Sequence, residues 1–453
     1  MPLKSLNLAA HYHINTNPSS HMFSSLILLA LAAFASARPF DNSTETLSKR
    51  ATTNAVYAHF IVGIVGNYQE ADWKNDFTLA QATGIDGFAL NIGLDSWTAT
   101  QLSYAYTVAN QVGFKLFISF DFAASPGYSD YVNQIVPILK AYLPNGASAQ
   151  YAGKPIVSTF SGDSFTSWPA VRALVPAFEL IPFVQAANIA AVGADGALQW
   201  NAWPSSNNAP VDTTMTTAGD TYYQQVLAGK PYMAGVSPWF YTHYSPSSYN
   251  KNWLYLSDTL LIDRWNEMLG TVKPQLIELL TWNDFGESHY IGPLHPTNTA
   301  VYAGNAGAWV TGMPHDGWRR IIQSYITAYK AGTAPVPTSA GESVVMWYRP
   351  NPKGLVCSDA VGPPTGYTYP ADSVWAAALL NSAATLQICS GGKCASAVLP
   401  AGVNYFSGPF GAGQPTFTLT RSGVTLLSGT GGLSINTVSC TTYNFNAYVQ
   451  AWP

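Results

Sequence analysis

Residues 276–290 read LIELLTWNDFGESHY, and this stretch decides the fold that we expect for the chain. It begins with a nearly continuous apolar run, which is typical of a strand buried in a parallel sheet. The turn that follows is rich in Trp, Asn, Gly and acids, and it places two carboxylates, Asp284 and Glu287, three positions apart. Parallel α/β barrels carry their functional groups on turns of this kind, at the carboxyl ends of their strands. The stretch therefore predicts a barrel strand that leads into a reactive loop.

Similar apolar runs alternate with segments of helical periodicity up to about residue 350. We expect strands at 57–65, 87–92, 115–121, 155–160, 181–186, 232–236, 276–282 and 344–348, and helices at 70–83, 96–112, 128–142 and 318–331. This alternation predicts an α/β fold, a (β/α)8 barrel over residues 51–350. A doubly wound open sheet is the alternative, but no glycine-rich dinucleotide fingerprint follows the first strand.

Residues 351–453 differ in texture, with many Gly, Ser, Thr and Val and few helix-like segments, and they predict a small C-terminal β-sandwich. All four cysteines lie here: Cys357, Cys389, Cys394 and Cys440. In a secreted chain an even number predicts two disulfides, with three possible pairings. A bond between Cys389 and Cys394 would close a tight hairpin and leave Cys357 to pair with Cys440. Such a domain serves either for packing or as an auxiliary sugar-binding module.

The N-terminus predicts secretion. Residues 22–37 have the apolar core and the small-residue cleavage site of a signal peptide, which makes residues 1–21 a doubtful extension. Residues 38–50 are polar and end in Lys49-Arg50, so we expect a propeptide there and a mature protein that begins at Ala51. The apolar run is too short to span a bilayer, so no membrane anchor is expected in the mature form.

The composition limits the classes of partner. Only 10% of the residues are charged, compared with about 25% in typical soluble domains. No basic stripe for nucleic acid is present. A surface poor in charge and rich in Tyr, Trp, Ser, Thr and Asn suits an extracellular monomer that acts on a neutral polysaccharide.

The turn at 281–290 has the groups that cleavage of a glycosidic bond requires. One carboxylic acid protonates the leaving oxygen, while a second group activates water or attacks. The alternative is that Asp284 and Glu287 only cap the following helix. Other polar or aromatic residues stand at strand ends or in the turn, where a barrel keeps its binding groups. We expect substrate-binding roles for His59, Asn91, Asp121, Asp163, Gln185, Trp239, Trp282 and Tyr290.

No metal or other cofactor is expected. The chain has no His-Glu-x-x-His motif, and His289 and His295 lack carboxylate or Cys partners at ligand spacing. Two carboxylates supply the proton transfers themselves, so the chemistry does not call for a metal-bound water.

Several separated motifs resemble the fungal α-1,3-glucanases (mutanases) of glycoside hydrolase family 71. They are VYAHF at 56–60, GIDGFALN at 84–91, TWNDFGES at 281–288, HDGW at 315–318 and WYRP at 347–350. The resemblance implies a (β/α)8 catalytic domain followed by a β-rich domain, and endo-acting hydrolysis of α-1,3-glucan with inversion. It also implies a catalytic pair at the positions of Asp284 and Glu287.

The spacing of the two carboxylates leaves retention and inversion both open, so inversion is only what the resemblance implies. We assign Glu287 as general acid and Asp284 as general base. Two other functions compete with α-1,3-glucan hydrolysis. One is hydrolysis of another neutral glucan, and the other is polysaccharide binding by a catalytically inactive barrel.

Overall fold

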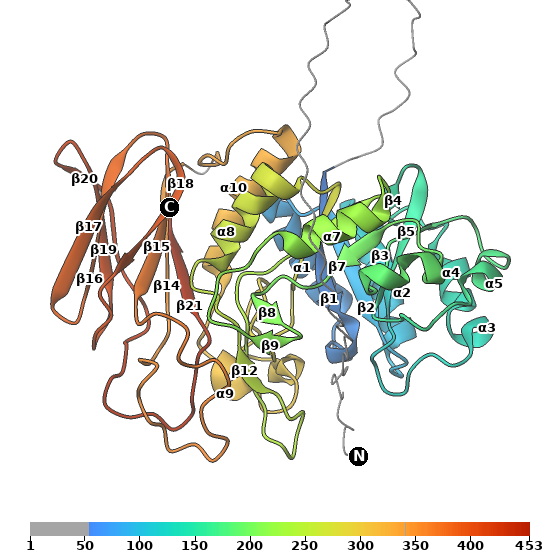
Figure 1. Cartoon of the computed structure of the whole chain (residues 1–453), viewed down its shortest axis with the longest axis horizontal. Coiled ribbons are helices and arrows are strands. Elements are labelled where there is room, and N and C mark those ends of the chain that lie inside the picture. The colour runs from blue at the N-terminus through green and yellow to red at the C-terminus, as the bar shows by residue number, and fades with distance from the viewer. Residues whose placement is uncertain (1–53, 340) are drawn as a thin grey trace, which may run out of the picture.

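The computed structural model of the chain describes residues 54–339 and 341–453. The expected extension at 1–21, signal peptide at 22–37 and propeptide at 38–50 lie outside these residues. Figure 1 shows two parts side by side. One is an α/β part and the other, drawn in orange to red, consists of antiparallel strands.

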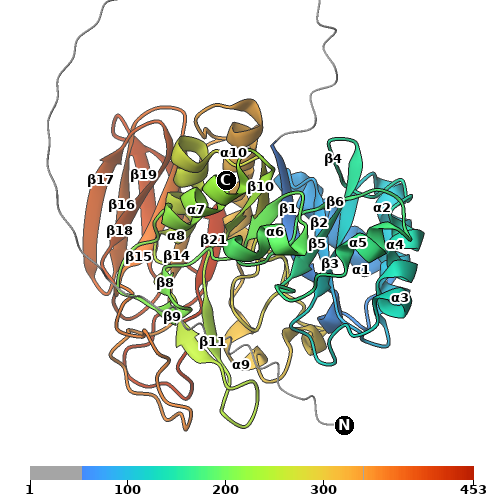
Figure 2. The same cartoon turned by 45° about the vertical axis from the view of Figure 1, so that its right-hand side comes forward.

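A curled parallel sheet forms the centre of the α/β part (Figures 1 and 2). Its strands lie in the order β5-β3-β2-β1-β13-β10-β7, and β6 also pairs with β5. Phe183 forms parallel bridges with Phe160 of β5 and with Leu198 of β7, so backbone pairing links both ends of this order. The strands are β1 (Ala55–Ile61), β2 (Gly87–Ile92), β3 (Lys115–Asp121), β5 (Lys154–Phe160), β6 (Glu179–Leu180), β7 (Ala197–Gln199), β10 (Tyr232–Val236) and β13 (Leu276–Leu279).

Helices pack against the outer face of this sheet. The longer ones are α1 (Glu70–Thr83), α2 (Thr98–Val112), α4 (Val136–Tyr142), α7 (Ala218–Leu227), α8 (Leu260–Glu267) and α10 (Asp316–Ala331). Shorter elements connect them: α3 (Tyr131–Gln134), α5 (Trp168–Arg172), α6 (Ile189–Val192), α9 (Gly307–Val310), β4 (Gln150–Tyr151), β8 (Ser205–Ser206), β9 (Ala209–Pro210), β11 (Tyr241–His243) and β12 (Asn252–Leu254).

The strand sequences are apolar because both faces of the sheet are buried. Tyr57 and Phe117 meet inside the curl with ring centroids 5.0 Å apart. On the outer face Phe60 packs against Phe88 and against Trp73 of α1. This pattern made the strands at 87–92, 115–121 and 232–236 and the helix at 70–83 predictable, and the structure confirms their bounds.

The expected eighth barrel strand at 344–348 is wrong. That segment is β14 (Ser343–Tyr348), which pairs antiparallel with β15 (Val374–Leu380) and β21 (Tyr448–Trp452). A short run that is apolar on both faces fits the core of either kind of sheet, and its periodicity does not distinguish them. The expected strand at 181–186 is also wrong in its bounds, because β6 is Glu179–Leu180 and only an isolated bridge follows at Phe183. Strand β7, which has only three residues, is missing from the sequence-based set.

The C-terminal part has two four-stranded antiparallel sheets, in the orders β18-β15-β14-β21 and β17-β16-β19-β20. Their facing side chains, Met346 and Ala376 from one sheet and Leu386 and Leu419 from the other, share one apolar core. The remaining strands are β16 (Ala384–Ser390), β17 (Lys393–Leu399), β18 (Gly402–Gly408), β19 (Thr416–Arg421) and β20 (Val424–Thr430). Both expected disulfides are confirmed, Cys357 with Cys440 and Cys389 with Cys394.

Helix α10 lies between the two parts and contacts β21 and β14 (Figure 1). It approaches the sheet so closely at Gly317 that an added Cβ would stand 2.8 Å from Val449 Cγ1. Two further contacts cross the boundary, since Trp239 Nε1 donates to the carbonyl of Phe445 at 2.9 Å and the Tyr241 hydroxyl donates to that of Tyr443. The sheets are therefore packed firmly onto the α/β part.

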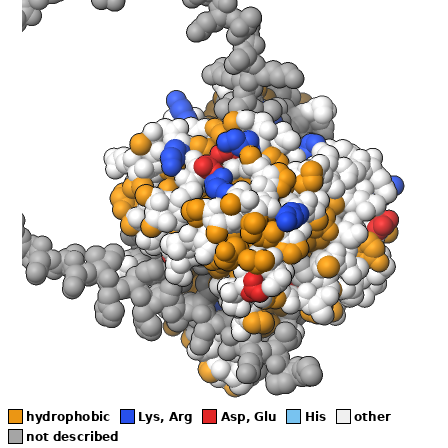
Figure 3. Space-filling view, turned by 90° about the vertical axis from the view of Figure 1, so that its right-hand side faces the viewer, with side chains coloured by type: hydrophobic (Ala, Val, Ile, Leu, Met, Phe, Trp, Pro, Cys, Tyr) orange, Lys and Arg blue, Asp and Glu red, His pale blue; other side chains and the backbone are white. Residues whose placement is uncertain are grey.

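Charged side chains are few on the face of the molecule in Figure 3, where several Lys and Arg gather around an acidic side chain in the upper part and the others stand apart among polar and apolar atoms. This face carries no continuous basic stripe. Within the residues described, no helix combines the length and hydropathy needed to cross a bilayer.

Candidate active site

The turn after β13 is clamped onto the end of β1. The backbone N–H of Trp282 donates to the carbonyl of His59 at 2.7 Å. The side chain of Asn283 accepts from the N–H of Ile61 at 2.8 Å and donates to its carbonyl at 3.1 Å. Because two strands fix the turn, the carboxylates that it carries have a defined position at the carboxyl edge of the sheet.

Asp284 and Glu287 are held side by side by their own turn and by contacts with Lys251 and His289. The N–H of Glu287 donates to Asp284 Oδ1 at 3.0 Å. Lys251 Nζ, from the hairpin between β11 and β12, lies 2.6 Å from Glu287 Oε1. His289 Nε2 stands 3.1 Å from Glu287 Oε2 and 3.6 Å from Asp284 Oδ2. The carboxylate side chains remain 20% and 18% exposed, so a ligand can reach them.

The surroundings drive the two pKa values apart. Burial raises the pKa of Asp284, and the charge of Glu287 adds to this, against the opposing effects of His289 and Lys251. Burial acts in the same direction on Glu287, but Lys251 and His289 outweigh it and lower the pKa of Glu287 to about 2. One carboxyl group thus holds its proton more readily than usual while its neighbour stays ionised, which is how acid and base roles are separated in a paired site.

The expectation that His289 has no carboxylate partner is wrong, since donor atoms of Asp284, Glu287 and His289 lie within 4.8 Å of one another. Such a set has the chemistry to bind a divalent cation. The ammonium of Lys251 already neutralises Glu287, however, and it would repel a second cation at this position.

Aromatic rings enclose His289 and the turn. The rings of Trp203 and Phe240 lie 5.2 Å and 5.5 Å from the His289 ring. The Tyr244 hydroxyl packs against Gly286, between the two carboxylates in sequence, and leaves no space there for a Cβ. The rings keep the imidazole from solvent and so strengthen its interaction with both carboxylates.

Three of the expected binding residues stand on adjacent strands beside this turn. His59 is buried in β1, with Nδ1 2.7 Å from Oε1 of the buried Glu278. Asn91 is buried near the end of β2. Asp121 ends β3, where one oxygen accepts from the N–H groups of Ala123 and Ala124. Burial raises the pKa of Asp121 to about 6.

The other expected binding residues have different surroundings. Asp163 accepts hydrogen bonds from the N–H of Gln185 and from the side chain of Asn188, both at 2.8 Å. Asp163 and Gln185 are therefore joined to each other, after β5 and β6, and not to the turn after β13. Trp239, Trp282 and Tyr290 are buried. Trp282 packs on Phe88, and Tyr290 stacks on His315 with ring centroids 3.9 Å apart. The structure places these three rings in the core rather than on a surface open to a ligand.

Two important residues are absent from the sequence-based set. Lys251 sits in a hairpin rich in Tyr, Ser and Asn, where a single basic residue signals no site. Trp200 directly follows the short strand β7 and is only partly buried, and its ring lies 4.7 Å from both the His59 and the Phe160 rings. A strand recognised at 197–199 would have pointed to this tryptophan as a strand-end residue.

Comparison of the sequence with known proteins identifies a family and several relatives. The profile of glycosyl hydrolase family 71 matches residues 52–453. A mutanase of Penicillium rubens is 43% identical over 437 residues, which cover 94% of this chain and 95% of that protein. A glucan endo-1,3-alpha-glucosidase of Schizosaccharomyces pombe is 41% identical over 87% of this chain and 95% of its own length. An ascus wall endo-1,3-alpha-glucanase of the same yeast is 28% identical over 88% of this chain and 98% of its own length.

The ion pair at Glu287 predicts a pH-dependent effect of Lys251→Met. Because the pKa of Glu287 is about 2 in the folded protein and 4.5 ordinarily, its ionisation stabilises the fold above pH 4.5, and that contribution is lost as the pH falls towards 2. Urea unfolding should show a clear destabilisation by Lys251→Met at pH 7 that shrinks at pH 3. Lys74→Met, at an exposed position of α1, is the control and should show no such pH dependence. An equal loss at both pH values in Lys251→Met would contradict the ion pair.

Proposed function

The chain belongs to glycosyl hydrolase family 71, and we propose that it is a secreted, endo-acting hydrolase of the α-1,3-glucosidic bonds of α-1,3-glucan. The names of the relatives from Penicillium rubens and Schizosaccharomyces pombe support this substrate. The observation that carries the reaction type is the carboxylate pair of Asp284 and Glu287 with oppositely shifted pKa values.

Asp284 is the general acid and Glu287 the general base in this proposal, which reverses the assignment expected from the sequence. The acid must keep a proton until the leaving oxygen takes it, and burial favours the protonated form of Asp284. The base must be ionised before it takes a proton from water, and Lys251 holds Glu287 in that state. His289 contacts both groups and steadies their relative position during the transfer.

The binding side of the site is proposed to lie on the adjacent strand ends. His59, Asn91 and Asp121 present polar groups to sugar hydroxyls, and Glu278 fixes the orientation of the His59 ring. Trp200, beside His59, has the flat apolar face on which a sugar ring stacks. These residues account for binding of a neutral sugar without a cofactor.

We also propose that the α/β part is a closed (β/α)8 barrel, that the C-terminal part is a β-sandwich, and that the protein is secreted. The bridges of Phe183 to β5 and β7 support a (β/α)8 barrel with β6 as its fifth strand, and the shared core of the C-terminal sheets supports a β-sandwich. The two disulfides and the leader at 22–37 support secretion to the medium or the cell wall. Recovery of the protein only from cell lysates, with free thiols, would contradict secretion.

Asp284→Asn and Glu287→Gln should each reduce hydrolysis of insoluble α-1,3-glucan by about 10² to 10⁴-fold, because each removes one of the proton-transfer groups. Reducing ends released over time measure the rate. Thermal unfolding should change little in Asp284→Asn, whereas Glu287→Gln should unfold at a lower temperature because it removes the ion pair with Lys251. Starch and β-1,3-glucan, neither of which should be cleaved, serve as substrate controls. Activity within a few fold of wild type in either variant would refute the pair.

Inversion is proposed from family membership, and it predicts that the first product released is the β-anomer. The facing oxygens of the pair lie within 4.8 Å, so inversion further requires that a water enters between them. Proton NMR of the anomeric signals in the first minutes of hydrolysis decides the point. Initial release of the α-anomer would instead show retention, with Glu287 as nucleophile.

A further inference from the structure

A second concave site lies where the loops of the C-terminal sheets meet α9. It is a groove of about 550 Å³, and neither Asp284 nor Glu287 lines it. Most of its lining is uncharged and polar: Asn351, Ser358, Asn436, Ser439, Thr442 and Asn444, together with Ser434 and Thr441. Among the described residues that line it, none carries a charge.

Four hydroxyl groups in this lining are free to bind a ligand. Within the described part of the chain, the side chains of Ser434, Ser439, Thr441 and Thr442 form no hydrogen bond, and all four are at least partly exposed. A hydroxyl group can both donate and accept a hydrogen bond. A side-chain amide also offers both functions, because its NH2 donates and its oxygen accepts. This lining suits a ligand that is itself rich in hydroxyls and uncharged. It does not suit a phosphate or a nucleic acid, which requires cationic partners.

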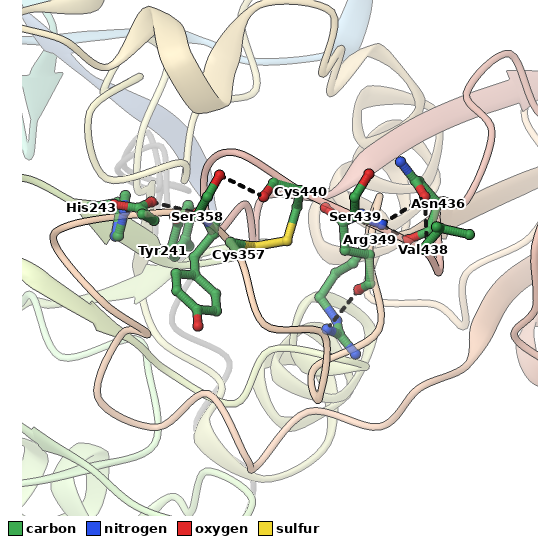
Figure 4. The surroundings of a disulfide bond; sticks show 12 residues. Tyr241, His243, Arg349, Cys357, Ser358, Asn436, Val438, Ser439 and Cys440 are labelled. Atoms are coloured by element: carbon green, nitrogen blue, oxygen red, sulfur yellow. Dashed lines mark hydrogen bonds and ion pairs between the residues drawn. A yellow bond between two sulfur atoms is a disulfide. The ribbon is translucent and has the colours of Figure 1, made fainter.

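The groove is held in shape before any ligand arrives. The Cys357–Cys440 disulfide ties its two loops together, with Ser358 and Ser439 close by (Figure 4). The N–H of Asn436 donates to the carbonyl of Pro350 at 2.9 Å, and Asn351 Nδ2 donates to the carbonyl of Asn436 at 2.8 Å. Because these loops are already ordered, binding costs little conformational entropy.

Two packed aromatic side chains, Trp309 and Tyr244, lie between the groove and the catalytic turn. Ala308 of α9 lines the groove, and its neighbour Trp309 packs edge-on against Tyr244, with ring centroids 5.0 Å apart. The Tyr244 hydroxyl in turn packs against Gly286. The groove therefore adjoins the packing that supports the catalytic turn.

We propose that this groove is a second binding site for a neutral glucan, which holds a segment of α-1,3-glucan remote from the bond being cleaved. The choice of α-1,3-glucan as the ligand rests on the function proposed above. A second point of attachment raises the effective concentration of substrate at the active site, and the gain is largest for long or insoluble chains. A short oligosaccharide cannot reach both sites, so it gains nothing.

Ser439→Trp tests the groove because the indole would fill it. Thr437→Trp is the matched control, since Thr437 is exposed in the same loop but does not line the groove. In the background of Glu287→Gln, depletion of protein by insoluble α-1,3-glucan measures binding without hydrolysis. We expect Ser439→Trp to weaken binding at least threefold and Thr437→Trp to leave it unchanged. With Glu287 intact, the ratio of the rate on insoluble glucan to the rate on an α-1,3-linked tetrasaccharide should fall at least threefold in Ser439→Trp alone.

Thr441→Trp provides a second variant at an exposed position of the lining, for use should Ser439→Trp fail to fold. Equal binding and equal rate ratios in the groove variants and in Thr437→Trp would overturn the second site. Failure of the proposed function is a different result, because the wild-type protein would then cleave neither the insoluble glucan nor the tetrasaccharide.

Discussion

The contact between Lys251 and Glu287 is the interaction on which the chemistry of this protein depends. At 2.6 Å and largely screened from water, the ammonium keeps Glu287 ionised although burial would favour its neutral form. Asp284 makes no contact with Lys251 among the contacts of the described residues, and its nearer basic neighbour is His289 Nε2 at 3.6 Å, so burial raises its pKa. Two carboxylates three residues apart thereby acquire opposite protonation preferences. Without Lys251, only His289 would oppose the effect of burial on Glu287, and the difference between the two acids would shrink.

This contact requires that two separate parts of the fold are correctly positioned relative to each other. Lys251 belongs to the hairpin of β11 and β12, and the N–H of Tyr241 in β11 donates to the carbonyl of Glu287 at 3.0 Å. The same hairpin is tied to the C-terminal segment, because the Tyr241 hydroxyl donates to the carbonyl of Tyr443. The other end of the catalytic turn meets that segment as well, where Asn446 Nδ2 donates to the Tyr290 hydroxyl at 3.1 Å. The segment that leads into β21 therefore contacts both the hairpin and the catalytic turn and supports their relative position.

Much of the fold and the reactive pair could be predicted from sequence because they are local. An apolar run bounded by turns defines β2, β3 and β10, and the spacing of Asp284 and Glu287 is visible in one turn. The misplaced strand at 344–348 shows the limit, since an apolar segment does not encode the sheet in which it pairs. The sequence likewise does not reveal the direction in which a side chain of a turn points. Trp282 and Tyr290 lie in the reactive turn, but they point into the core, whereas Trp200 at the end of a three-residue strand stands beside His59. Lys251 was out of reach because its partner is 36 positions away.

The assignment of Asp284 as acid and Glu287 as base is tested most directly with a substrate whose leaving group needs no proton. An α-fluoride of an α-1,3-linked glucose oligosaccharide meets this condition, because fluoride departs as the anion. The account predicts that Asp284→Asn cleaves this fluoride at a rate close to wild type while its hydrolysis of α-1,3-glucan is lost. It also predicts that Glu287→Gln loses both activities, since no base remains to activate water. Cleavage of the fluoride by Glu287→Gln but not by Asp284→Asn would contradict the account and restore the opposite assignment.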